Sequence, residues 1–135
     1  MPIALEIVSP EKLLLSRPVD MVVVPAEEGD IGVLGGHAPM IVTLRGGFTT
    51  IYEGGHAGEK LFVAGGFAEI TPERCTVLAG EVYRPGDLSK ATAERRLAEA
   101  ESGWQAVDKM NVALRDASLA ALQIARAMIA AAEAP

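Results

Sequence analysis

The sequence predicts a chain in two parts, a flattened antiparallel β-sandwich of about ten strands over residues 1–88 and an antiparallel two-helix hairpin over residues 89–135. Composition changes sharply between them: 13 of the 14 glycines and seven of the eight prolines precede Asp87, whereas 15 of the 47 residues in the second part are alanine. Short β-branched stretches bounded by glycine and proline are typical of strands, and alanine-rich stretches are typical of helices. The adjacent Pro85 and Gly86 mark the predicted domain boundary.

The first part is predicted to consist of short strands that are rich in β-branched and aromatic residues. They cover residues 3–9, 11–16, 19–26, 38–44, 47–53, 59–66, 67–71 and 74–80. Ile3, Leu5 and Ile7 alternate with other residues, which places one face of that strand inward. The segment "EGGHAG", residues 53–58, is typical of a hairpin loop. Many short strands without an intervening helix favour a sandwich or a flattened barrel.

The second part is predicted to form two helices, residues 89–101 and 107–133, with a break at Ser102 and Gly103. Apolar residues recur on the second helix at alternating steps of three and four, as in a heptad stripe. The stripe consists of Val107, Met110, Leu114, Ala117, Ala121, Ile124 and Met128. A two-helix hairpin of this length buries little apolar surface, so we expect it to pack against the sandwich or against a partner protein.

The bulk composition excludes several functional classes. The net charge of −6 disfavours nucleic acid or an anionic membrane as the main partner. The single cysteine, Cys75, rules out an internal disulfide framework and is typical of a reducing compartment. The sequence shows no secretory leader and no apolar run near the roughly 20 residues of a membrane span. We therefore expect a soluble cytoplasmic protein, which can still sit beside a membrane complex.

The glycine-rich segment "GDIGVLGGHAPM", residues 29–40, has the look of a phosphate-binding loop but lacks the chemistry of one. The chain contains no Gly-Lys pair and no dinucleotide-binding glycine pattern, and Glu27, Glu28 and Asp30 would repel phosphate. We interpret the segment as a connection between strands in which glycine supplies unusual backbone conformations. The residues predicted to structure it are Gly35, Gly36, His37 and Pro39.

Neither a reaction centre nor a metal site is predicted. His37, His56 and Cys75 lack the spacing of a zinc site, which needs about four ligands. Cys75 lies within an apolar strand, as an inert buried thiol does. No nucleophile is marked near His37, which we expect to bond to the backbone of its own loop. The sequence thus predicts no catalysis, no metal and no cofactor.

The order of motifs resembles the epsilon subunit of the F-type ATP synthase. "EGDIGVLGGHAPMIVTLRGG" is followed by "FVAGGFAEITPERCTVLAGEV", then by "PGDL" and a helical hairpin. The likeness is strong over residues 1–88 and is one of length and helical pattern over residues 89–135. It implies the same sandwich and hairpin in a non-catalytic rotor subunit of the central stalk. Such a subunit binds the gamma subunit and the c ring, and helps to couple proton flow to ATP synthesis. It is peripheral to the cytoplasmic face of the inner membrane.

The resemblance also implies which residues make these contacts. An acidic loop would face the c ring, and its charges would steer docking more than hold it. This loop comprises Glu27, Glu28, Asp30, Ile31 and Gly32. A second surface would contact the gamma subunit. It comprises Met40, Val42, Gly65, Gly66 and Phe67.

One window departs from the members of the family that bind ATP, which carry [IL]-D-x-x-R-A at the start of the first helix. The corresponding window here is "LSKATA", residues 88–93, where Ser89 replaces the aspartate and Thr92 replaces the arginine. Without that arginine a phosphate loses a charge-assisted hydrogen-bond donor. We therefore expect weak ATP binding or none.

The resemblance further implies that the hairpin contacts the alpha/beta catalytic head and inhibits ATP hydrolysis, through basic residues that meet acidic ones. The candidate latch residues here are Lys109, Arg115 and Arg126. Nearby acidic residues offset their charge, so we expect a weak latch. Two alternatives from other classes are a stand-alone interaction module and a sugar-binding or small-molecule-binding sandwich. The 4% aromatic content disfavours the latter.

Overall fold

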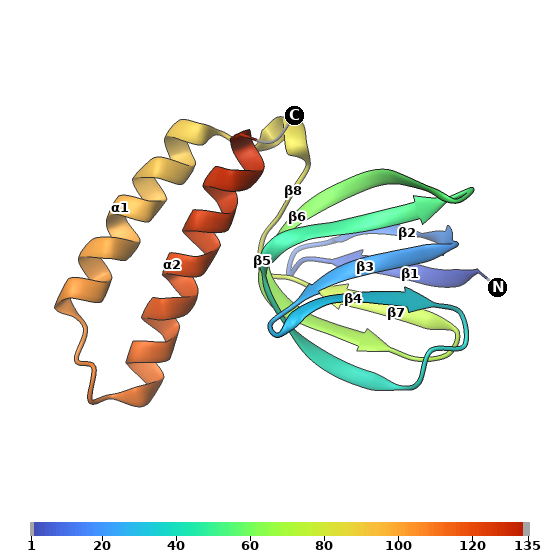
Figure 1. The fold of residues 1–135 in the computed structure, drawn as a ribbon, viewed down its shortest axis with the longest axis horizontal. Helices are drawn as coiled ribbons and strands as arrows, with labels where there is room; N and C mark the ends of the chain where they lie inside the picture. Colours follow the sequence, from blue (N-terminus) through green and yellow to red (C-terminus); the bar gives the residue numbers. More distant parts are fainter. Residues whose placement is uncertain (1, 134–135) are drawn as a thin grey trace.

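The computed structural model describes residues 2–133, in which a β-sandwich precedes two antiparallel helices, as the sequence predicted (Figure 1). The strands are β1 (Ile3–Val8), β2 (Leu13–Val19), β3 (Met21–Ala26), β4 (Gly29–Leu34), β5 (Met40–Glu53), β6 (His56–Ile70), β7 (Arg74–Leu78) and β8 (Val82–Tyr83). A 3₁₀ turn at Pro85–Asp87 leads to helix α1 (Lys90–Ala106) and helix α2 (Val112–Glu133).

The strands form one eight-stranded sheet in the order β2-β1-β7-β6-β5-β3-β4, with β8 paired to β6. Strands β5 and β6 each run without interruption where the sequence predicted two shorter strands, and β4 and β8 were missed. The described residues therefore hold eight strands instead of about ten. All neighbouring strands are antiparallel except β1 and β7, which are parallel. The sheet folds back on itself, so that Arg17 of the edge strand β2 lies 2.9 Å from Glu53 at the end of β5.

The sandwich core is made by alternating side chains from nearly every strand. Ile3, Leu5 and Ile7 are fully buried, as their spacing predicted, and they pack with residues of β3, β6 and β7. Cys75 lies in the same core, where desolvation raises the pKa of its thiol to about 11. Burial of this apolar surface is the main driving force for the sandwich.

The helical hairpin differs from the prediction at its turn. Helix α1 continues through Ser102 and Gly103 to Ala106, so the predicted break there is wrong. The connection comprises residues 107–111, where Asp108 and Asn111 accept backbone hydrogen bonds from Met110 and Leu114. These short polar side chains satisfy helix-end donors, which explains why α2 begins at Val112 and not at residue 107. Within residues 2–133, neither helix has the length and apolar character needed to cross a membrane.

The buried face of α2 also differs from the predicted heptad stripe. Met110 and Leu114 are exposed, as are Ala117 and Ala121, and of the predicted stripe only Met128 is fully buried. The buried residues of α2 are Leu122, Ala125, Met128 and Ala131. This face packs on two surfaces at once, α1 and strands β5 and β6, and a two-partner contact need not follow a heptad. Phe62 of β6 is fully buried in the contact, beside Ala93 and Met128.

Candidate interaction surfaces on the sandwich

The acidic residues predicted to face a partner lie at the tight turn between β3 and β4. Glu27 and Glu28 form this turn, and both are exposed. Asp30, Ile31 and Gly32 lie on strand β4, so the prediction of one continuous loop from residue 29 is wrong. Strand β4 forms because Ile31 and the buried Val33 alternate inward while the strand pairs along β3. The glycines on either side hid this pattern in the sequence.

Arg45 of β5 holds the turn in place. One guanidinium nitrogen donates to the Ala26 carbonyl, and the other lies 2.7 Å from Asp30 Oδ1. The Glu27 amide also donates to the Thr43 carbonyl of β5, at 2.8 Å. The carboxylate of Asp30 is therefore engaged within the chain, although 59% of its side chain is exposed. Among residues 2–133, no cation lies within ion-pair distance of Glu27 or Glu28.

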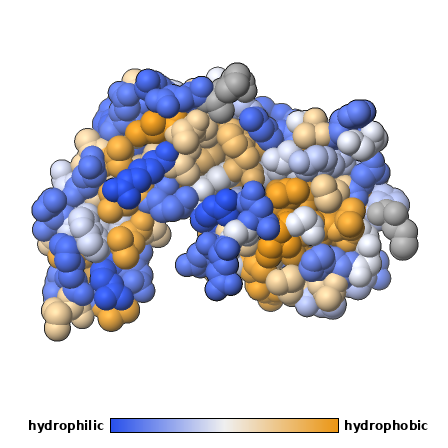
Figure 2. All heavy atoms as spheres, viewed as in Figure 1, coloured by the Kyte–Doolittle hydropathy of each residue, from blue (hydrophilic) through white to orange (hydrophobic). Residues whose placement is uncertain are grey.

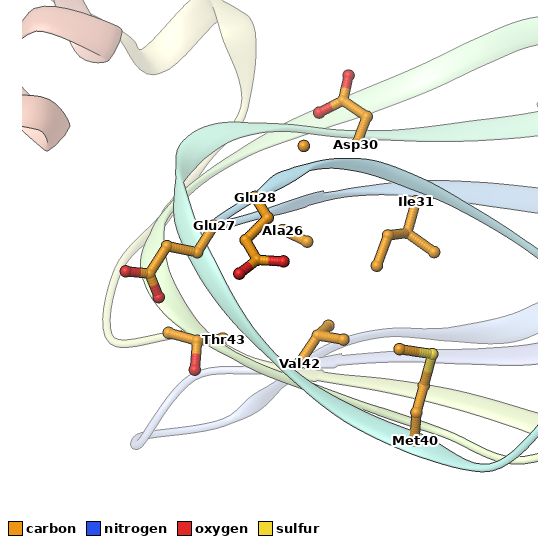
Figure 3. A pocket seen from close by; sticks show the side chains of 9 residues that line it. Ala26, Glu27, Glu28, Asp30, Ile31, Met40, Val42 and Thr43 are labelled. Atoms are coloured by element: carbon orange, nitrogen blue, oxygen red, sulfur yellow. The ribbon is translucent and has the colours of Figure 1, made fainter.

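A depression of about 460 Å³ lies beside this turn. Figure 3 shows Ile31 of β4 with Met40 and Val42 of β5 around the same space, whereas Asp30 points away from it. Met40 and Val42 were predicted to lie on a different surface from the acidic turn formed by Glu27 and Glu28. The structure brings them together, because the start of β5 runs close to the β3–β4 turn. Arg45 was missed, and its only signal was being the sole cation in the stretch from residue 18 to residue 59.

The loop between β4 and β5 contains the residues predicted to structure it. Gly36 has a φ of +87°, which favours glycine, and its amide donates to the Pro72 carbonyl at 2.7 Å. His37 Nδ1 lies 2.8 Å from the carbonyl oxygen of Ala38, and Pro39 directly precedes β5. These bonds support a structural role for His37. Together with Gly35, these residues form a short connection at the end of the sandwich.

A second surface consists of apolar residues aligned across four strands, three of them exposed and one half-buried. Phe67 of β6 pairs with Leu78 of β7, Leu78 pairs with Val8 of β1, and Val8 pairs with Leu13 of β2. Phe67 and Leu13 are each 54% exposed and Leu78 is 46% exposed. We call these four residues the apolar row. Aligned, exposed apolar side chains of this kind mark protein contacts more often than isolated ones do.

Of the residues predicted for this second surface, only Phe67 belongs to the apolar row. Gly65 and Gly66 have positive φ angles, and Gly66 lies close against the backbone of Leu78 and Ala79. A Cβ atom added at Gly66 would lie 2.1 Å from the Leu78 carbonyl oxygen. Backbone conformation thus explains why both positions are glycine. Leu13 and Leu78 were missed, since an exposed residue in a strand cannot be told from a buried one without the register.

The hairpin is attached to the sandwich by two polar contacts besides its apolar face. Arg96 of α1 makes two hydrogen bonds to the Glu81 carboxylate, at 2.6 and 2.7 Å, and Tyr83 also donates to Glu81. Gln123 of α2 bonds to the backbone of Gly46. Next to the Gln123 contact, a groove of about 650 Å³ lies between α2 and strands β5 and β6. Figure 2 shows this hollow between the two lobes, with hydrophilic residues on its sandwich side.

The candidate latch residues are partly engaged within the hairpin. Lys109 donates to the Trp104 carbonyl and lies over the Trp104 ring, 4.6 Å from its centroid. Arg115 pairs with the neighbouring Asp116 at 3.3 Å. Arg126 is exposed on α2. Their predicted contacts with a catalytic head stay predictions.

The residues that correspond to the ATP-binding motif cap the N-terminus of helix α1. Ser89 is the N-cap of α1, and its hydroxyl accepts a hydrogen bond from the Thr92 amide at 3.2 Å. The adjacent cavity, which Asp87 and Leu88 also line, measures only about 60 Å³. Among residues 2–133, no three histidine, cysteine or acidic side chains gather closely enough to hold a metal ion.

Comparison with known proteins identifies the family. A family model described as the β-sandwich domain of the ATP synthase delta/epsilon chain matches residues 2–85. The ATP synthase epsilon chain of Granulibacter bethesdensis is 57% identical over 129 residues, which cover 96% of each chain. The chain belongs to the ATP synthase epsilon-chain family. The epsilon chain of Gluconacetobacter diazotrophicus is 49% identical over 135 residues, covering 100% of this chain and 96% of that one.

Two solved structures contain chains with a similar fold. A chain in the cryo-EM structure of the Euglena gracilis mitochondrial ATP synthase, comprising OSCP, F1 and the c-ring, superposes with a TM-score of 0.75 at 26% identity. The match covers 96% of this chain and 81% of that one. A chain from the Tetrahymena thermophila central stalk and c-ring shares the fold, with a TM-score of 0.65 at 12% identity. The epsilon chain is a stalk subunit of ATP synthase and not its catalytic subunit.

Proposed function

We propose that this epsilon chain is a rotor subunit that links the gamma subunit to the c ring and so helps to couple proton translocation to ATP synthesis. The observation that carries the proposal is the pair of distinct surfaces on one rigid sandwich, the acidic turn and the apolar row. A link between two partners needs two such surfaces, held at a fixed separation by a packed core. In this proposal the chain is peripheral to the cytoplasmic face of the inner membrane.

The acidic turn is the proposed contact with the c ring. Glu27 and Glu28 are its available carboxylates, because Asp30 is engaged by Arg45. Exposed charges at the rim of an interface change association rate and salt dependence more than affinity. Ile31, Met40 and Val42 add apolar surface in the adjoining depression. Binding to the c ring should therefore be sensitive to salt.

The apolar row is the proposed contact with the gamma subunit, with Phe67 as its anchor. Aromatic residues dominate the energetics of protein interfaces, and Phe67 is the exposed aromatic of this row. Leu13 and Leu78 extend the row on either side of Val8. Gly65 and Gly66 shape the strand next to Phe67, so they support the contact through the backbone.

The experiment is co-purification of the full-length chain with the gamma subunit and with the c ring from the same source. Phe67→Asp is expected to lower gamma binding at least about 100-fold, as the loss of an aromatic anchor does. Met110→Asp is the matched control, since Met110 is 89% exposed but lies in the helix connection. The Glu27→Gln, Glu28→Gln double variant should retain gamma binding and lose the salt dependence of c-ring binding. Unchanged gamma binding by Phe67→Asp would overturn the assignment of the apolar row.

The proposed role of the hairpin is a weak brake on ATP hydrolysis through the alpha/beta head. The three candidate cations are few, and Lys109 and Arg115 already have partners within the hairpin. Deletion of residues 89–135 should raise the ATPase activity of the assembled complex only modestly. A many-fold rise would show that the hairpin inhibits strongly in spite of its charge pattern.

A further inference from the structure

Strand β5 leaves its partner β3 in the middle of the sandwich. Ala26 of β3 pairs with Leu44, and three residues earlier along β3 Val23 pairs with Thr50, which lies six residues further along β5. The register shift leaves β5 residues between Leu44 and Thr50 without a ladder partner on the β3 side. Such a bulge exposes backbone groups that must find other partners when they are buried.

Gln123 of α2 supplies the partner for Gly46 in this bulge. The Gly46 amide donates to Gln123 Oε1 at 2.7 Å, and Gln123 Nε2 donates to the Gly46 carbonyl at 2.8 Å. A side-chain amide carries one acceptor and one donor group, so it replaces both bonds of a missing strand residue. Only glycine allows this approach, because a Cβ atom at residue 46 would lie 2.9 Å from the Ile124 Cα atom.

The residues next to Gly46 hold the acidic turn. Arg45 binds the Ala26 carbonyl and the Asp30 carboxylate, and the Thr43 carbonyl accepts the Glu27 amide. The anchor of α2 and the anchors of the turn therefore lie within four residues of one another on β5. Glu27, Arg45 and Gln123 also line the same groove between the lobes. A change in the path of the bulge would move both sets of anchors together.

We propose that docking of α2 and the conformation of the acidic turn are coupled through Arg45 and Gly46. The docked helix fixes the bulge, the fixed bulge holds Arg45 on the turn, and the held turn presents Glu27 and Glu28 in one arrangement. A cationic partner that binds the turn thus stabilises the docked hairpin, and docking tightens the partner's binding by the same factor. That the partner is the c ring rests on the proposed function, whereas the coupling within the chain does not.

The test of the coupling is amide hydrogen–deuterium exchange on the full-length chain without any partner. Gln123→Met removes both hydrogen bonds that the side-chain amide makes to Gly46 and keeps the length of the side chain. We expect exchange to rise about threefold or more both in α2 and in residues 26–31. Gln105→Met, at an exposed position of α1, is the matched control and should change neither region. Faster exchange in α2 with an unchanged turn would overturn the coupling.

Two further variants test the coupling at Gly46 and at Arg45. Gly46→Ala displaces α2 by steric contact with Ile124, and Gly58→Ala is its control because a Cβ there meets only ordinary contacts. If neither Gln123→Met nor Gly46→Ala loosens α2, the Gly46 contact is not its anchor and the proposal is wrong. Arg45→Met acts from the other side: it should free the turn and also speed exchange in α2, because coupling is reciprocal.

Binding to the detergent-solubilised c ring separates the coupling from the proposed function. Gln123→Met should lower c-ring affinity several-fold, although residue 123 does not lie on the acidic turn. If the wild-type chain fails to bind the c ring, the proposed function fails in that part, and the exchange measurements still decide the coupling. If the wild type binds and Gln123→Met binds equally well, the turn is not controlled by the hairpin and the coupling is overturned.

Discussion

Gly66 shows how one residue sets the path of a long strand. Its φ of +116° is a conformation that residues with a Cβ rarely adopt, and the Leu78 carbonyl oxygen occupies the space where a Cβ would lie. At Gly66 the backbone of β6 thus packs directly against the backbone at the end of β7, with no side chain between them. The neighbouring Phe67 is exposed at the surface.

The Gly66→Ala variant should be strongly destabilised. Strained backbone and overlap with the Leu78 carbonyl together should lower the free energy of unfolding by about 3 kcal/mol or more. Gly80→Ala is the matched control, since the space around Gly80 is open and its φ is not positive. Chemical denaturation of both variants measures the difference. A loss at Gly66 no larger than at Gly80 would contradict the geometry.

Thr49 is a buried polar residue with an unmet hydrogen bond. Its side chain is fully buried, and among residues 2–133 its hydroxyl oxygen has no hydrogen-bond partner. Thr49→Val keeps the shape and removes the hydroxyl, so the free energy of unfolding should rise by about 1 kcal/mol. Thr50→Val, at the neighbouring half-buried position, should change it little. A clear loss of stability at residue 49 would mean that the hydroxyl has a partner in solution.

Single residues also mark where sequence reasoning stops. The alternation of Ile3, Leu5 and Ile7 predicted their burial, because it depends only on local geometry. The role of Arg45 depends on a turn 15 residues away in the chain, and no local pattern encodes that contact. The apolar row is invisible for the same reason, since it exists only in the register of four strands.

At the scale of elements, two helix features were predicted wrongly for physical reasons. Ser102 and Gly103 are poor helix formers, yet α1 passes through them. Their helix cost, about 1 kcal/mol for glycine and less for serine, is small enough for the rest of the helix to override. Helix α2 buries a face shifted from the predicted stripe, since it packs on the sandwich as well as on α1. Helix propensity and hydrophobic periodicity describe an isolated helix, and neither indicates that α2 also packs on the sandwich.

The contact between α1 and the sandwich should depend on pH. Hydrogen bonds from Arg96, and then from Tyr83, hold the pKa of the Glu81 carboxyl below its ordinary value of 4.5, although partial burial opposes them. Because the folded pKa is lowered, this contribution to stability is present above pH 4.5. It is lost as the pH falls through the folded pKa.

The Glu81→Gln variant tests this dependence. The wild type should unfold at a higher temperature than the variant at pH 6, and the gap should narrow once the pH is well below 4.5. Glu101→Gln, at an exposed position of α1, is the control and should match the wild type at both pH values. A gap that stays constant with pH would show that the ionised carboxylate is not what stabilises the contact.

At the scale of the whole molecule, the two-part architecture followed from composition, because glycine, proline and alanine report backbone preference directly. The order of the sequence motifs predicted the family, and the match to the family model confirmed it. The sequence did not show how the hairpin lies on the sandwich. That arrangement depends on the bulge in β5 and on Gln123, two features far apart in the chain.

The docked arrangement leaves little room for a nucleotide at the start of helix α1. The cavity at Ser89 and Thr92 measures about 60 Å³, and Asp87 brings an acidic side chain to its lining. We expect isothermal titration of the full chain with MgATP to give no saturable heat, and its unfolding temperature to be unchanged by MgATP. A micromolar dissociation constant would contradict this expectation.

The burial of Cys75 makes the chain its own reporter of unfolding. A thiol that is fully buried and whose pKa is raised to about 11 reacts with alkylating reagents only when the sandwich opens. Labelling of the native thiol therefore measures the rate of global opening without any added probe. A cysteine placed on the acidic turn or on the apolar row could in turn be labelled selectively in the folded protein, with Cys75 left in place.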